Sequence, residues 1–124
     1  MKLWVTGSQD WDDDMTLARA ITLVIQEMSD DDKSITFFHL DREGAEQKAG
    51  SYVAKTKSFL SGKGFKIAEF IPPKNISFEE RLDKILAQSP ELMIIFNKGA
   101  DYKAGKIRES AQLQKIKVIE YKFS

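Results

Sequence analysis

The residues that could take part in chemistry gather just after the first apolar run. The stretch from Leu3 to Trp11 reads LWVTGSQDW. An apolar run that stops at a small, flexible triplet before an acidic, helix-opening stretch is typical of a buried parallel strand that ends in a binding crevice. There, Gly7 could admit a ligand or make a sharp turn, and Ser8 could donate to a phosphate or cap a helix. Trp11 could stack on a base or cover the edge of the core.

Further candidates follow two later apolar runs. His39 ends one of them, and Arg42 and Gly44 come directly after it. Because His39 is the only histidine, a site with several histidines is excluded, and the residue is either a structural hydrogen-bonding group or a base. Arg42 is expected on an exposed loop, where it could contact a phosphate. Lys98 and Lys103 belong to a basic cluster after the later run, and this cluster is either simply solvated or supplies cations to a ligand.

Composition excludes several classes of protein. The 124 residues, 42% of them hydrophobic, predict one domain over residues 1–124, and the absence of cysteine excludes disulfides and cysteine-ligated zinc. We predict no metal and no cofactor. Nineteen basic and nineteen acidic residues cancel, so there is no strong signal for nucleic-acid binding. No apolar run approaches the ~20 residues that a bilayer requires, so we expect a cytoplasmic protein without a membrane partner.

The charges are nevertheless unevenly distributed. Residues 1–32 contain eight acidic and two basic side chains, whereas residues 97–124 contain three acidic and seven basic ones. Charge runs of this kind usually form solvated faces. The alternative is that the later strand ends attract an anionic ligand.

Strands and helices are expected to alternate along the whole chain. Five short runs rich in β-branched or aromatic residues predict strands at Lys2–Thr6, Ser34–His39, Phe65–Phe70, Glu91–Phe96 and Lys117–Tyr121. Helical patterns separate them, with Asp12 to Asp14 at the positive end of the first helix and a last helix from about Ala104 to Gln114. Ser77 and Glu80 predict a capping box.

This βαβαβαβαβ pattern predicts a three-layer, Rossmann-like α/β fold. Its five parallel strands should lie in the order 3-2-1-4-5, with helices on both faces and ligands at the carboxyl ends of the strands. The second helix carries Tyr52, Phe59 and Leu60 on a long face that the core of a small domain does not cover entirely. We therefore expect a homodimer.

The stretch from Val5 to Trp11, followed by a strand that ends in His39 and then by Gly44-Ala45-Glu46, resembles small members of the SLOG superfamily. These are Rossmann-like proteins related to the DNA-processing protein A domain and to the LOG cytokinin-activating phosphoribohydrolases, and the YspA-like group is the most similar branch. The segment from Ile116 to Tyr121 also matches, so the resemblance covers nearly the whole chain. It implies a nucleotide or a nucleotide-derived small molecule as ligand.

The glycine motifs of that family are altered in this chain. The family's second loop reads His-Gly-Gly-Ala-x-Gly-Ala-Asp, whereas residues 39–46 have Leu40 and Asp41 in place of the first two glycines. The Asp41 carboxylate would repel a phosphate, and Arg42 could offset that repulsion. The glutamate of the hydrolytic relatives falls on Gly105 or Ile107, neither of which is acidic. The resemblance therefore implies binding without an intact hydrolytic centre.

The sequence is thus interpreted as that of a binding protein for a nucleotide or nucleotide-derived small molecule. The expected ligand contacts are Gly7, Ser8, Gln9, Asp10, Trp11, His39, Arg42, Gly44, Lys98 and Lys103. One alternative is an enzyme, a hydrolase or transferase of nucleotide N-glycosidic bonds that uses Asp10 or Glu109 as its carboxylate. Another is a ligand-free scaffold of phage or mobile-element origin that acts through protein contacts.

Overall fold

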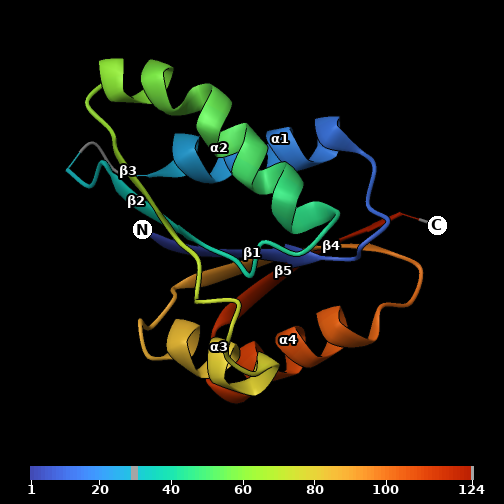
Figure 1. Cartoon of the computed structure of the whole chain (residues 1–124). Helices are drawn as coiled ribbons and strands as arrows, with labels where there is room; N and C mark the ends of the chain where they lie inside the picture. Colours follow the sequence, from blue (N-terminus) through green and yellow to red (C-terminus); the bar gives the residue numbers. More distant parts are fainter. Residues whose placement is uncertain (29–30, 124) are drawn as a thin grey trace.

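A computed structural model describes residues 1–28 and 31–123, which form a central sheet between two layers of helices (Figure 1). All four strand pairings are parallel and the order is β3-β2-β1-β4-β5, which confirms the predicted topology. The strands are β1 (Lys2–Gly7), β2 (Ser34–Phe38), β3 (Lys66–Phe70), β4 (Leu92–Lys98) and β5 (Lys117–Phe123). The helices are α1 (Asp14–Glu27), α2 (Ala45–Gly62), α3 (Phe78–Leu86) and α4 (Tyr102–Leu113).

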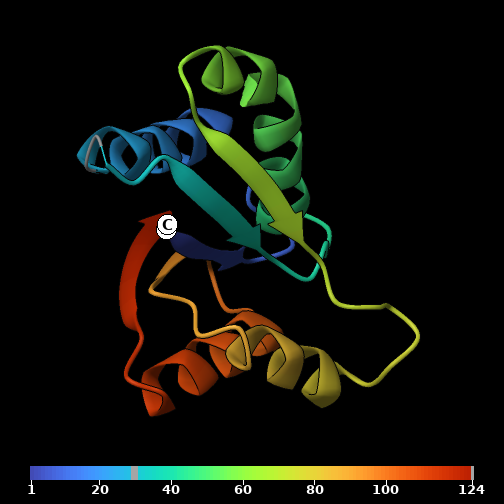
Figure 2. The same ribbon diagram turned by 90° about the vertical axis from the view of Figure 1, so that its left-hand side faces the viewer.

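The helices divide evenly between the two faces of the sheet. Figure 1 and the rotated view in Figure 2 show α1 and α2 on one face and α3 and α4 on the other. Right-handed crossovers produce this division. The chain winds outward from β1 to β3 and then returns to β4 on the other side of β1, so the later crossover helices cover the opposite face of the sheet. Leu3 and Val5 pack toward α1 and α2, whereas Trp4 packs toward α3 and α4. Buried apolar runs therefore continue without interruption over Leu3–Val5 of β1 and Leu92–Phe96 of β4, while the buried Thr6 of β1 is polar.

Acidic and hydroxyl side chains fix the starts of three helices. Asp13 caps α1 by accepting from the backbone N–H of Thr16 at 3.0 Å, so the acidic triplet has a helix-capping role as predicted. Ser77 caps α3 by accepting from the Glu80 N–H at 3.1 Å, which confirms the N-cap half of the predicted capping box, and the Ser77 hydroxyl donates to the Glu80 carboxylate at 3.2 Å. Asp101 caps α4, which therefore begins two residues before the predicted start.

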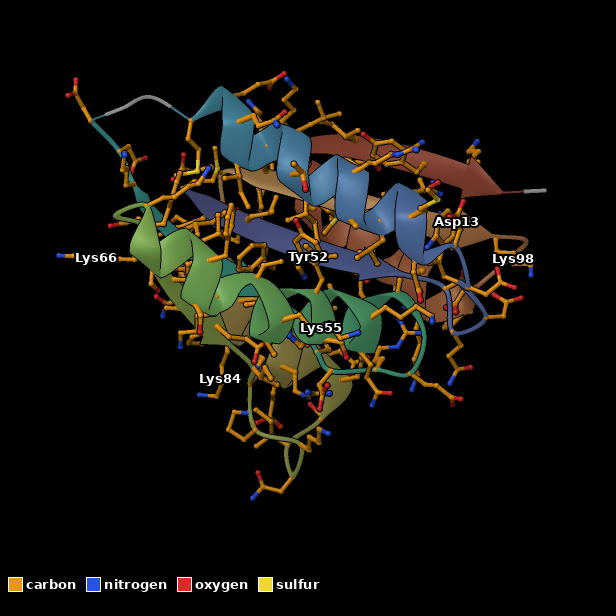
Figure 3. All side chains as sticks on the ribbon, turned by 90° about the horizontal axis from the view of Figure 1, so that it is seen from above. Asp13, Tyr52, Lys55, Lys66, Lys84 and Lys98 are labelled. Carbon is orange, nitrogen blue, oxygen red and sulfur yellow. The ribbon has the colours of Figure 1, made fainter. Side chains whose placement is uncertain are left out.

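The carboxyl ends of the strands meet at one end of the molecule. Figure 3, which looks down onto α1 and α2, shows Asp13 and Lys98 at this end, and Lys66, the first residue of β3, lies away from it. Tyr52 bridges the two helices in the same view through a 2.6 Å hydrogen bond between its hydroxyl and that of Thr22. None of the described helices is long and apolar enough to cross a membrane.

Candidate functional site

Hydrogen bonds close the crevice between β1 and β4, where the strand order reverses. The buried Ser8 donates its backbone N–H to the Phe96 carbonyl at 2.9 Å, and its hydroxyl oxygen accepts from the Lys98 N–H at 2.8 Å. The Gln9 N–H donates to a carboxylate oxygen of Asp101 at 3.0 Å. Ser8 therefore neither caps α1 nor presents its hydroxyl to solvent, and the loops after β1 and β4 are joined to each other.

Gly7 and Gly44 are needed for close packing of backbone. A Cβ atom at Gly7 would overlap the Phe96 carbonyl and would lie 2.7 Å from the Ala45 Cβ. Gly44, which has a φ of 91°, lies against the carbonyls of Ser8 and Gln9. Because these neighbours belong to the protein itself, the space beside both glycines is filled without a ligand.

The backbone amides of the loop after β2 converge on a carboxylate, but that carboxylate belongs to Glu46 of the protein itself and not to a ligand. The fully buried Glu46 accepts from the backbone N–H of Leu40 at 2.8 Å, from that of Arg42 at 3.3 Å and from the Thr6 hydroxyl at 3.1 Å. Burial raises the pKa of Glu46, and the Arg42 guanidinium, the two amides and the Thr6 hydroxyl act in the opposite direction. These two amides are therefore already occupied.

Arg42 joins this carboxylate to the start of α4. Its guanidinium donates to Glu46 at 3.2 Å and to both carboxylate oxygens of Asp101 at 3.2 and 3.3 Å. Only 11% of its side chain is exposed, so the expectation of an exposed loop arginine is wrong. Partial burial acts to raise the pKa of Asp101, but the Ala104 and Gln9 amides and Arg42 together lower it. We call Thr6, Arg42, Glu46 and Asp101 the Arg42 network.

Both ring nitrogens of His39 are engaged within the fold. The Asp41 N–H donates to Nδ1 at 2.9 Å, so in the neutral ring Nε2 carries the proton and donates to Glu69 at 2.8 Å. His39 is also buried, which favours the structural interpretation over a base. Asp41 adopts a left-handed φ of 56° and pairs with Lys74 at 2.8 Å.

Four of the ten predicted contacts, Gln9, Asp10, Trp11 and Gly44, line one cavity, and Lys98 and Lys103 lie outside its lining. Trp11 is buried with 2% exposed, packs against Phe96 with ring centroids 5.3 Å apart, and donates its indole N–H to the Asp13 carbonyl at 3.0 Å. Lys98 pairs with Asp12 at 3.1 Å, and the exposed Lys103 lies over the Phe78 ring.

The two candidate carboxylates of the enzyme alternative do not meet. Asp10 lines a cavity of about 430 Å³ between the loops after β1 and β2, together with Gln9 and Gly44. Glu109 lies exposed on α4 beside Gln112 and Leu113, where it lines a different cavity. Within residues 1–28 and 31–123, no group of three or more His, Asp or Glu side chains is placed to hold a metal ion.

A larger cavity of about 840 Å³ lies at the carboxyl ends of β4 and β5, beside the first turns of α4. We call it the β4–β5 cavity. Its lining residues are Asn97, Gly99, Ala100, Asp101, Tyr102, Gly105, Arg108, Glu120 and Lys122. Gly105 helps to leave this space open, since a Cβ built there meets no atom within 4 Å. None of the ten predicted ligand contacts lines this cavity.

A fixed carboxylate lies in this cavity. Glu120 accepts from Arg108 at 3.1 and 3.0 Å, one distance to each carboxylate oxygen, and from the side-chain N–H of Asn97 at 2.6 Å. The other end of that amide, Asn97 Oδ1, is buried and accepts from no described residue. The Tyr102 ring stands 77% exposed at the rim. The cavity therefore offers hydrogen-bonding groups and an aromatic surface together.

Sequence reasoning did not single out Asn97, Tyr102, Arg108 or Glu120 as site residues. The available signal was a polar residue at an inward-facing position near the end of each of two strands, but the apolar pattern had already ended there. Comparisons with family models, with characterised proteins and with solved structures find no match to the chain. The function is therefore inferred from this geometry.

Proposed function

We propose that the protein binds a nucleotide or nucleotide-derived small molecule in the β4–β5 cavity, without an intact hydrolytic centre. The observation that carries this proposal is the cavity itself, which has about 840 Å³ of space at the carboxyl ends of two parallel strands. Cavities of roughly 300 to 1,000 Å³ hold small ligands, and ligands of open parallel sheets bind at this end of the strands.

The lining residues suit the parts of such a ligand. The exposed Tyr102 ring provides a flat surface on which a base can stack. Arg108 and Lys122 provide cations for a phosphate, while Asp101 and Glu120 balance them, so the charged lining is neutral overall. A ligand with one phosphate therefore fits this lining better than a triphosphate, whose greater negative charge would face both carboxylates.

The Arg42 network argues against a phosphate in the crevice between β1 and β4. Asp101 and Glu46 already accept from the amides of Gln9, Leu40 and Arg42 at distances between 2.8 and 3.3 Å. An incoming phosphate would have to displace a hydrogen-bonded carboxylate, with loss of the charge-assisted bonds to Arg42. The proposed site therefore lies on the other side of β4 from the predicted crevice.

Gly105 allows a matched test of this site. Millimolar adenosine or guanosine 5′-monophosphate should raise the melting temperature of the wild type, because a ligand that binds only the folded state stabilises it. Gly105→Trp should fill the cavity, prevent binding and so abolish this rise. Gly105→Ala is the control, since it adds only a methyl group and should keep the shift. It should also stabilise α4 by about 1 kcal/mol. Melting curves and calorimetric titrations measure both effects.

Two outcomes would contradict the proposal. If no nucleotide shifts the wild type or gives a binding isotherm, the chain is better explained as a scaffold. If Gly105→Trp binds as tightly as Gly105→Ala, the ligand does not occupy the β4–β5 cavity.

We further propose that the protein is a SLOG-like member of the Rossmannoid proteins that acts in the cytoplasm as a homodimer. Tyr52 and Leu60 are engaged by the protein's own helices, so a dimer through α2 would rest on Phe59, which is 64% exposed. Light scattering at micromolar concentration should give twice the 14.1 kDa of the chain, and Phe59→Glu should halve that mass. A wild-type mass of one chain would contradict the dimer.

A further inference from the structure

The strand pairing places two polar side chains under α4. Ile119 and Tyr121 of β5 pack toward α1 and α2, and because side chains alternate along a strand, Glu120 faces the α4 side. Asn97 follows Phe96, which packs toward α1 and α2, so Asn97 also faces α4. Both side chains therefore form the floor of the β4–β5 cavity, where the apolar cover of α4 ends.

Glu120 is held in one orientation with accepting capacity left over. Arg108 bonds to both of its oxygens, and Asn97 bonds to Oε2. An ionised carboxylate has about four acceptor positions, so these bonds leave room for a further donor. With 22% of the side chain exposed, that donor can arrive from the cavity.

Asn97 offers a second acceptor beside the first. Its Oδ1 is buried and finds no donor among the residues that the structure describes. Buried polar atoms in folded proteins nearly always have a partner, and Oδ1 has less than 1 Å² of accessible surface, so an entering group reaches it only when the Asn97 side chain shifts toward the cavity that it lines. Oδ1 belongs to the same amide whose nitrogen lies 2.6 Å from Glu120, so the two acceptors are neighbours.

Two neighbouring acceptors match two neighbouring hydroxyl donors. The ribose of a nucleotide carries such a pair at its 2′ and 3′ positions, and a carboxylate on these hydroxyls is a common solution in nucleotide-binding α/β folds. We propose that Glu120 and Asn97 bind the ribose hydroxyls, so that the cavity selects ribonucleotides over 2′-deoxyribonucleotides. This inference rests on the proposed function and adds the sugar specificity of the same site.

The test compares two ligands on one protein. Calorimetric titration of the wild type with adenosine 5′-monophosphate and with its 2′-deoxy analogue should give a Kd that is about tenfold or more weaker for the deoxy compound, because the missing 2′-hydroxyl leaves one of the two acceptors without a donor. Glu120→Gln should bring the two Kd values together, mainly by weakening the ribonucleotide. Gln keeps the shape of Glu and still accepts from Arg108. Glu109→Gln, on the same helix but outside the cavity, is the matched control and should keep the wild-type ratio.

Each outcome separates the two claims. Equal affinity of the wild type for the ribo and deoxy compounds overturns the ribose contact and leaves nucleotide binding standing. Absence of binding for both compounds overturns the proposed function as well. If the Glu120→Gln variant keeps the wild-type ratio, Glu120 does not contact the 2′-hydroxyl of the sugar. Because the ribo-to-deoxy ratio is measured within one protein, a change in stability does not produce it, and the wild-type comparison needs no variant at all.

Discussion

Single residues at the strand ends show how the loop after β2 satisfies its own polar groups. The amides of Leu40 and Arg42 donate to the carboxylate of Glu46. Arg42 then bridges Glu46 to Asp101. Because both carboxylates belong to the chain, the guanidinium of Arg42 has its counter-ions within the fold and needs no bound anion.

Asp101 gives this network a testable pH dependence. Its folded-state pKa is lowered below the ordinary value of 3.8, so the stability it contributes is present at neutral pH and is lost as the pH falls through the folded-state pKa. Asp101→Asn can still cap α4 but loses its charge toward Arg42. We expect the free energy of unfolding to fall by about 1–3 kcal/mol at pH 7, as measured by urea denaturation.

The same difference should shrink as the pH falls below about 4, because Asp101 of the unfolded wild type then binds a proton that the folded protein, with its lower pKa, binds only at a still lower pH. A stability difference that stays constant down to pH 3 would show that the Asp101 charge does not support the network.

For Trp11 and His39, the sequence left open whether the side chain binds a ligand or has a structural role, because the partners that decide this are distant in sequence. Trp11 and His39 both proved to be engaged within the fold, and the histidine owes this to Glu69, thirty residues away. Arg42 was expected on the surface because a loop arginine usually is. Its burial depends on Asp101, 59 residues later, and a local pattern contains no information about that contact.

Among the elements, the buried strands were the most predictable part. Central strands covered on both faces read as continuous apolar runs, and the helices between them show one apolar stripe. The predicted ends were less accurate: β4 and β5 continue two residues further than expected, to Lys98 and Phe123. Polar residues occupy these last positions of β4, so the apolar pattern stops while the backbone ladder goes on through the pair Lys98 and Phe123.

This extension of the ladder explains why the proposed β4–β5 cavity lies apart from the site residues predicted from the sequence. Asn97 belongs to β4 rather than to a loop, and it therefore lies beside β5 instead of reaching over the crevice at β1. The cavity also depends on α4 beginning at Tyr102, which lines it together with Gly105. The sequence predicted a site at the carboxyl ends of the strands, which is the end where the β4–β5 cavity lies, but the open space on the β5 side of β4 follows only from the packed arrangement of α4 against β5.

At the scale of the whole molecule, the strand order sets how stability is distributed. β1 lies at the centre with β2 and β4 beside it and helices on both faces, and Leu3, Trp4 and Val5 are completely buried. β3 pairs only with β2, and Lys66, Ala68 and Glu69 of this edge strand are exposed. A central strand can separate only when the fold opens as a whole, whereas an edge strand can separate alone.

Hydrogen exchange measured by mass spectrometry should reveal this order. We expect peptides that cover β1 and β4 to exchange only through global unfolding. When low concentrations of urea are added, their protection should therefore decrease with the same slope as the overall free energy of unfolding. The peptide that covers β3 should exchange sooner and respond less to urea, since its opening exposes little surface. If β3 is protected as strongly as β1, then β3 opens only with the rest of the sheet, and the edge strand is part of a single cooperative unit rather than its weakest strand.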